Sequence, residues 1–256
     1  MTIDNRQSAI ANREVRVFDN LEALSWAAAT RFVDLARVRA LEKKPFSAAL
    51  SGGSTPQRLY ELLGSPTFAG GVRWRNVHLF QVDERCVPPD NPQSNYRMMR
   101  HALLESVPLP EKNLHRMAAE RADREAAARE YAVELARVLT PAPGEWPRLD
   151  LIFLGMGSDG HTASLFPGSA ALNERAEWVS PNFAPALNSF RLTLTLPVLN
   201  AAAHLIFLVA GEDKAETLRQ VLEGPAGKYP AQLIQPAQGR VGWFLDKSAA
   251  QLLKGK

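Results

Sequence analysis

Short apolar runs alternate with helical patterns along this chain, and the alternation limits its possible folds more than any other feature. The segment 19–44 places Leu21, Leu24 and Ala28 at three- and four-residue steps, which predicts an amphipathic helix. The apolar runs that follow it include FSAAL, VHLFQV, LDLIFLG, HLIFLV and VGWFLD. Because strands that alternate with helices form parallel sheets, we expect an α/β fold with a mostly parallel sheet and helices on both of its faces.

The chain shows no sign of a second domain, an export signal or a membrane segment. No Gly/Ser linker, repeat or low-complexity tract divides it, so we expect residues 1–256 to form a single domain. Its longest apolar stretch is shorter than the ~18 residues of a membrane span, and its N-terminal residues lack the continuous apolar core of a signal peptide. Cys86 is the single cysteine, which excludes a disulfide within the chain and indicates the cytoplasm.

The positive charges are scattered rather than clustered. The formal net charge is +3, but the basic groups VRWR and EKK are too short to form a stripe that could follow a nucleic acid. We therefore expect an ordinary solvated surface and no nucleic-acid partner.

Four of the apolar runs end in loops that carry polar or charged residues: SGGST, DER, MGSDGH and GEDK. In an open parallel sheet the carboxyl ends of the strands share one edge, where ligands bind. We therefore expect Gly53, Asp83, His161 and Lys214 to meet there, although they are far apart in the sequence.

The loop SGGSTP has the composition of an anion site at the start of a helix. Its glycines allow close approach of the backbone, Thr55 is a suitable N-cap, and Pro56 suits the first helical position, so free N–H groups are expected to face an anion. The Lys-Ser/Thr pair of a P-loop is missing. An ordinary strand-to-helix turn is the alternative interpretation.

The stretch GMGSDGH contains a literal G-x-G-x-x-G but lacks the context of a dinucleotide site. The polar residues HTAS and then Pro167 follow where a long helix is needed. His161 stands two residues after Asp159 on this loop, and an imidazole is suited to act as a general base at neutral pH. The alternative is a loop histidine that only hydrogen bonds to the backbone.

No other motif supplies a metal site or a nucleophile. A G-x-S-x-G elbow is missing, which disfavours a serine nucleophile. No metal-ligand spacing relates the remaining histidines, so we predict no metal; these are His78, His101, His115 and His204. Base-assisted attack of water, or proton transfer, on a phosphorylated small molecule is the chemistry that remains.

Five motifs in this order carry a resemblance to a known family: ALSGGSTPQRLYELL, VHLFQVDERCVPPDNPQSNY, LDLIFLGMGSDGHTASLFPG, RLTLTLPVLNAA and LVAGEDKAETL. Together they resemble the 6-phosphogluconolactonases, whose superfamily also holds the glucosamine-6-phosphate deaminases. The resemblance runs from about residue 15 onward, so residues 1–14 are expected to be a variable N-terminal extension. It implies a Rossmann-like three-layer sandwich and a cytoplasmic, metal-free enzyme without a cofactor.

The resemblance also implies a reaction and roles for single residues. The reaction is hydrolysis of 6-phosphoglucono-1,5-lactone to 6-phosphogluconate in the oxidative pentose phosphate pathway. His161 is expected to take a proton from the attacking water, and Asp159 to hold the imidazole or the loop. The expected substrate-binding residues are Ser51, Gly52, Gly53, Ser54, Asp83, Arg85, Asn95, Arg191 and Lys214.

Within that set, the phosphate is expected on the backbone of residues 51–54, with Arg85, Arg191 and Lys214 as candidate cations. The sequence does not decide which cation serves the phosphate and which the oxyanion. Asp83 and Asn95 are expected to bind sugar hydroxyls or to order the loop. For all these residues except His161, a structural salt bridge or turn cap is the alternative.

Two other functions stay open at this level. In the deaminases the corresponding loop carries a glutamate seven positions beyond its aspartate, but here that position is Phe166, which disfavours a deaminase or isomerase. A sugar-phosphate or nucleotide binding module without catalysis is the third candidate. The expected partner is a phosphorylated sugar lactone, with no membrane association, and a monomer is favoured.

Overall fold

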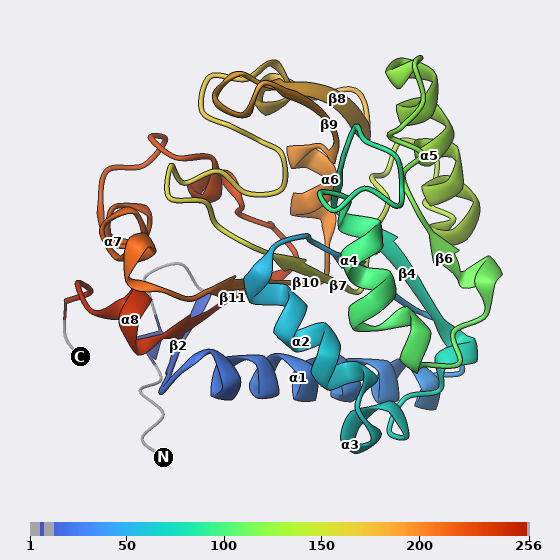
Figure 1. Ribbon diagram of the computed structural model, residues 1–256, viewed down its shortest axis with the longest axis horizontal. Coiled ribbons are helices and arrows are strands. Elements are labelled where there is room, and N and C mark those ends of the chain that lie inside the picture. Colours follow the sequence, from blue (N-terminus) through green and yellow to red (C-terminus); the bar gives the residue numbers. More distant parts are fainter. Residues whose placement is uncertain (1–5, 8–12, 255–256) are drawn as a thin grey trace.

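An eight-stranded sheet forms the centre of the protein in the computed structural model, which describes residues 6–7 and 13–254 (Figure 1). The strand order is β1-β2-β11-β10-β7-β3-β4-β6, and every pairing is parallel except that of β1 with β2. The strands are β1 (Arg6–Gln7), β2 (Arg13–Phe18), β3 (Phe46–Leu50), β4 (Val77–Gln81), β6 (Leu114–His115), β7 (Leu151–Leu154), β10 (His204–Val209) and β11 (Arg240–Asp246). The prediction of a mostly parallel α/β sheet is confirmed.

Helices cover both faces of this sheet, as Figure 1 shows. One buried cluster joins the sheet to α1 (Leu21–Leu41), α2 (Ser54–Gly64), α3 (Pro66–Ala69) and α4 (Asn95–Ala102). The cluster on the other face joins it to α5 (Arg124–Leu139), α6 (Leu196–Ala201), α7 (Ala215–Glu223) and α8 (Lys247–Ala250). The central strand β7 is buried along its whole length, because a parallel strand between two helical layers has no solvent-facing side. This arrangement is the expected three-layer sandwich.

A second, smaller sheet was not predicted from the sequence. It consists of β5 (Asp83–Arg85), β9 (Ser189–Leu194) and β8 (Val179–Ala184), paired antiparallel in that order. The residues DER were expected to lie in a loop, and they instead pair with β9. The small sheet brings Arg85 and Arg191 opposite each other.

The expected N-terminal extension contributes to the main sheet. Arg6–Gln7 forms β1, and Arg13 and Glu14 begin β2, which pairs with β11. The other residues of that expected extension, 1–5 and 8–12, lie outside the described residues.

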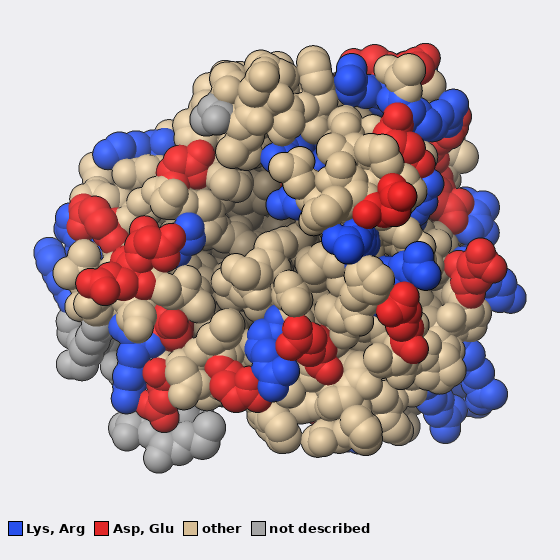
Figure 2. All heavy atoms as spheres, in the orientation of Figure 1, with Lys and Arg blue, Asp and Glu red and all other residues tan. Residues whose placement is uncertain are grey.

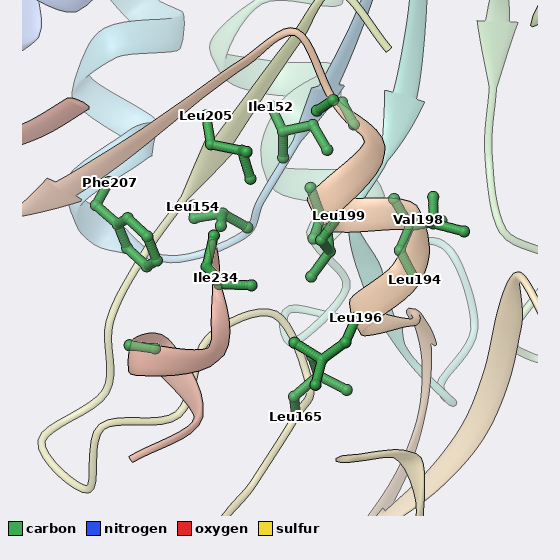
Figure 3. Close-up of a cluster of buried hydrophobic side chains, with 14 of the residues drawn as sticks. Ile152, Leu154, Leu165, Leu194, Leu196, Val198, Leu199, Leu205, Phe207 and Ile234 are labelled. Atoms are coloured by element: carbon green, nitrogen blue, oxygen red, sulfur yellow. The ribbon is translucent and has the colours of Figure 1, made fainter. Parts of the chain in front are cut away.

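A histidine loop, residues 155–168, leaves β7 and returns to the core through Leu165. This leucine is fully buried and belongs to the same cluster as Leu194 and Leu196, toward which it points in Figure 3. Burial of such a side chain stabilises a protein by roughly 1.5–3 kcal/mol, so the loop is fastened to the core one residue before Phe166. Two 3₁₀ helices follow later in the chain, η6 (Glu212–Lys214) and η7 (Pro230–Leu233). Among the described helices, none has the length and apolar character needed to cross a membrane.

Candidate active site

A pocket of about 290 Å³ lies at the carboxyl ends of β3, β7 and β10, beside the small sheet. Figure 2 shows this face of the molecule hollowed between the β8–β9 hairpin above and α2 and α4 below, with basic side chains in the wall of the hollow. The structure brings together all the site residues predicted from the sequence except Asp159, which is absent from the pocket lining and bonds to His161. The predicted residues in its lining are Ser51, Gly52, Gly53, Ser54, Asp83, Arg85, Asn95, His161, Arg191 and Lys214.

His161 and Asp159 form a hydrogen-bonded pair at this pocket. The Nδ1 atom of His161 lies 2.5 Å from Oδ1 of Asp159, and the same oxygen accepts the His161 backbone N–H at 3.1 Å. A carboxylate at Nδ1 favours the tautomer that carries its proton there, which leaves Nε2 with a free lone pair. The geometry is therefore that of an oriented base, and it differs from the alternative of a histidine that bonds only to the backbone.

The Asp159 carboxyl is kept in its charged form. Partial burial raises its pKa, but the backbone N–H and the imidazole of His161 outweigh this effect, so the pKa lies below its usual value. A charged carboxylate is the stronger acceptor, and it also stabilises the imidazolium that forms when the base takes a proton.

Phe166 covers one side of the imidazole. Its ring centroid is 4.5 Å from that of His161, and the phenyl ring is largely buried while still lining the pocket. An apolar side chain therefore occupies the position seven residues beyond Asp159, where the resemblance described above implies a glutamate in a deaminase.

The anion loop, residues 51–54, leads into α2, and the helix begins earlier than predicted. Gly53, rather than Thr55, is the N-cap, and Ser54 is the first helical residue. Gly53 has φ +109° and ψ 166°, a backbone conformation that is essentially restricted to glycine. The first helical backbone bond described here joins the Gln57 N–H to the Gly53 carbonyl, so the earlier N–H groups of Ser54 and Thr55 can face a ligand.

Ser51 has a structural part in this loop. Its hydroxyl donates to the Phe153 carbonyl at 2.7 Å, and its own carbonyl accepts the Tyr60 hydroxyl at 2.8 Å. The residue is 4% exposed. Only the backbone near Ser51 is therefore available to a substrate.

Two arginines of the pocket have no acidic partner within the described part of the chain. Arg85 donates to the Gln93 carbonyl, and the buried Arg191 leaves its Nε without an acceptor. Burial lowers the pKa of the Arg191 guanidinium, and the neighbouring charge of Arg85 lowers it further. Two like charges on adjacent strands repel each other, so an anion between them is strongly favoured. The Lys214 ammonium lies 2.9 Å from the Asp213 carboxylate.

Asp83 and Asn95 order the pocket wall. Ser164 donates its hydroxyl to Asp83 at 2.6 Å, and the Asn95 amide donates to the Asp83 carbonyl at 2.9 Å. The Oδ1 of Asn95 is buried without a donor in the described residues and lies against Gly52. The loop-ordering interpretation of these two residues therefore has direct geometric support.

Glu84 is a supporting residue that the sequence analysis missed. The residue is 3% exposed, and its carboxylate accepts the backbone N–H groups of Asn95 and Tyr96, each at 2.8 Å, at the start of α4. It also accepts from the side chain of Gln81 at 2.8 Å. A carboxylate at a helix start is stabilised by the helix dipole, but the sequence gives no sign that β5 lies beside α4.

The described residues contain no group of three or more His, Cys, Asp or Glu side chains placed to hold a metal ion. His78 and His115, two of the histidines considered above, hydrogen bond to each other at 2.9 Å. His115 also contacts Glu134 at 2.6 Å. His78 lies near the amino end of β4, His115 pairs with Phe80, and neither histidine lines the pocket.

Comparison with known proteins places this architecture in a family. The sequence profile of the family described as glucosamine-6-phosphate isomerases/6-phosphogluconolactonase matches residues 19–243. The 6-phosphogluconolactonase of Synechocystis sp. is 41% identical over 215 residues, covering 83% of this chain and 87% of its own. That of Nostoc sp. is 42% identical over 206 residues, covering 80% and 83%.

A solved structure agrees with these sequence relatives. The 6-phosphogluconolactonase from Trypanosoma brucei superposes with a TM-score of 0.83 at 31% identity, covering 93% of this chain and 97% of that one. The family profile spans most of the chain, and the strand-end loops that it covers are those that build the pocket. The chain therefore belongs to the family of glucosamine-6-phosphate isomerases and 6-phosphogluconolactonases.

Proposed function

We propose that this chain is a 6-phosphogluconolactonase, a carboxylic ester hydrolase that converts 6-phosphoglucono-1,5-lactone and water into 6-phosphogluconate, the second step of the oxidative pentose phosphate pathway. One observation carries the proposal: an oriented histidine base faces a pocket in which Asp83, the sole carboxylate among the described lining residues, is already hydrogen bonded. Lactone hydrolysis needs one base, a water molecule and positive or N–H groups near the oxyanion. The names of the relatives support the same reaction.

His161 acts as the base in this proposal. Its Nε2 takes a proton from water while the water oxygen attacks the lactone carbonyl carbon, and the carbonyl electron pair moves onto oxygen. When the tetrahedral intermediate collapses, the bond from that carbon to the ring oxygen breaks, and the imidazolium returns its proton to the departing oxygen. The products are a carboxylic acid and a free hydroxyl. Asp159 holds Nδ1–H throughout and stabilises the imidazolium.

The anion loop and the cations hold the phosphate and the oxyanion. The N–H groups of Ser54 and Thr55 offer two donors at a helix start, and Arg85 and Arg191 offer charge without an acidic partner among the described residues. The separate replacements Arg191→Met and Lys214→Met assign the roles. Loss of a cation that binds the phosphate raises KM for the phosphorylated lactone alone. Loss of a cation that stabilises the oxyanion lowers kcat for glucono-1,5-lactone as well.

The test of the function compares two substrates. We expect prompt formation of 6-phosphogluconate from freshly made lactone, above the spontaneous rate, and no ammonia from glucosamine-6-phosphate. Ring opening and deamination need a further acid. Phe166 cannot supply a proton, and both carboxylate oxygens of Glu84 already accept backbone N–H groups. Glu174 lies outside the pocket lining and accepts backbone N–H groups. Ammonia release as fast as lactone hydrolysis contradicts the assignment.

We further propose that the enzyme acts as a monomer in the cytoplasm on a free small molecule, without a metal or cofactor. Cys86 is the single cysteine, so no disulfide can form within the chain, which supports a reducing compartment. Light scattering of the purified chain tests the oligomeric state, and a dimer mass at micromolar concentration contradicts this part.

A further inference from the structure

The histidine loop contacts a distant part of the chain, of which Lys214 lines the pocket and the other residues lie outside the lining. This part is the anchor segment, residues 212–234, which comprises η6, α7 and η7. Two hydrogen bonds join the segment to the loop. The Thr217 hydroxyl donates to the Ser158 carbonyl at 2.5 Å, and the Ala231 N–H donates to the Gly160 carbonyl at 3.1 Å.

These two carbonyls flank Asp159 on both sides. The peptide group that joins Ser158 to Asp159 and the one that joins Gly160 to His161 are therefore both fixed from outside the loop. Within the loop, the Gly157 N–H donates to the His161 carbonyl at 2.9 Å, and the Gly160 N–H donates to the Gly157 carbonyl at 3.0 Å. The turn that presents Asp159 to the imidazole is thus closed internally and held externally.

The ring of Tyr229 adds a packing contact to the same turn. Gly160 has φ +75°, and a Cβ placed on it would lie 2.4 Å from Cδ1 of Tyr229. The aromatic ring therefore rests directly on the backbone of the turn. Tyr229 is itself fixed, because its N–H and that of Lys228 both donate to Oε1 of the buried Gln232 at 3.0 and 2.9 Å.

We infer that Thr217 and Tyr229 are positioning residues: they hold the turn 157–161 so that the Asp159 carboxylate meets Nδ1 of His161. The inference rests on the proposed role of His161 as the base. A displacement of about 1 Å at a catalytic group can cost on the order of 10²-fold in rate, so a loosened turn lowers turnover without removing a group that touches the substrate. Lys214, a proposed substrate-binding cation, belongs to the anchor segment as well. A variant that displaces Lys214 raises KM, whereas a variant that only loosens the turn lowers kcat, so the two parameters separate these effects.

The experiment compares two disruptive variants with their conservative counterparts. Thr217→Val removes the hydroxyl, and Thr217→Ser keeps it; Tyr229→Ala removes the ring, and Tyr229→Phe keeps it. We expect the disruptive variants to lower kcat by roughly 10- to 100-fold, with KM for the lactone within about threefold of the parent value. The conservative variants retain most of kcat. As a matched control, Thr30→Val removes a threonine hydroxyl bond of 2.9 Å to the Trp26 carbonyl in α1 and leaves kcat unchanged.

A second readout needs no substrate. In ¹⁵N spectra of histidine-labelled protein, with the His161 signal assigned through His161→Ala, we expect an Nδ1–H tautomer in the parent protein and in Thr217→Ser and Tyr229→Phe. The disruptive variants show a mixture of tautomers. If the parent protein lacks lactonase activity but its spectra behave in this way, the proposed function fails and the positioning role stands. An unchanged tautomer in both disruptive variants overturns the inference, as does a rise in KM with kcat retained.

Discussion

Replacing Gly53 by valine tests the anion loop most directly. Its φ of +109° and ψ of 166° lie in a region that costs a non-glycine residue about 1–3 kcal/mol. An added Cβ meets only Pro56 Cδ, at 3.8 Å, so backbone strain rather than a clash is the dominant effect. If the free loop relaxes to escape that strain, the phosphate must restore the bound shape, and KM for the phosphorylated lactone rises by roughly 5- to 150-fold.

The assay measures hydrolysis of 6-phosphoglucono-1,5-lactone and of glucono-1,5-lactone, both corrected for spontaneous opening. Only the phosphorylated lactone should show the increase, and Ser54→Ala, which keeps the backbone N–H, should change KM little. Gly144→Val is the matched control, because Gly144 has φ +82°, lies outside the pocket, and has no atom within 4 Å of its added Cβ. It should lower the free energy of unfolding without affecting KM. Equal increases for both lactones, or none in Gly53→Val, refute the reasoning.

The other predictions concern the base, the cofactor and a peripheral ion pair. His161→Ala should lower kcat by ~10²- to 10⁴-fold, with the fold intact by circular dichroism; near-parental activity of the variant removes His161 from the mechanism. Activity should survive exhaustive chelation and need no added nucleotide; recovery with one divalent ion after loss would show a metal enzyme. A bond from Arg137 and one from His115 lower the pKa of Glu134 to about 2 against the opposing effect of burial, so its stabilising contribution is complete above pH ~4.5 and is lost as the pH falls toward 2. The difference in unfolding free energy between the parent and Glu134→Gln, from urea titrations, should therefore shrink from pH 6 to pH 3; a constant difference contradicts this.

The strand-end loops were predictable because a parallel sheet places all its carboxyl ends at one edge. That rule brought Gly53, Asp83, His161 and Lys214 together from sequence alone, and the structure lines one pocket with them. The start of α2 was placed too late, since Thr55 and Pro56 satisfy the cap pattern as well as Gly53 and Ser54 do. Cap patterns identify a helix start only to within a residue or two.

The small sheet and the supports of the site could not be predicted. A three-residue strand such as β5 is too short to show a period, so its pairing with β9 leaves no mark on the sequence. The parts played by Glu84, Thr217 and Tyr229 depend on contacts between segments that are distant in the chain. Such contacts follow from tertiary packing and have no local signature.

The place of β11 in the main sheet has a consequence for the order of events during synthesis. This strand lies between β2 and β10, with Val241 opposite Arg13, so residues near both ends of the described chain are neighbours in the sheet. Until residues 240–246 have left the ribosome, β2 has no parallel partner and β10 has an open edge. Contacts of such long sequence separation slow folding, and open strand edges invite aggregation. We therefore expect nascent chains that stall before residue 240 to depend on chaperones, whereas released chains complete the sheet in one late insertion.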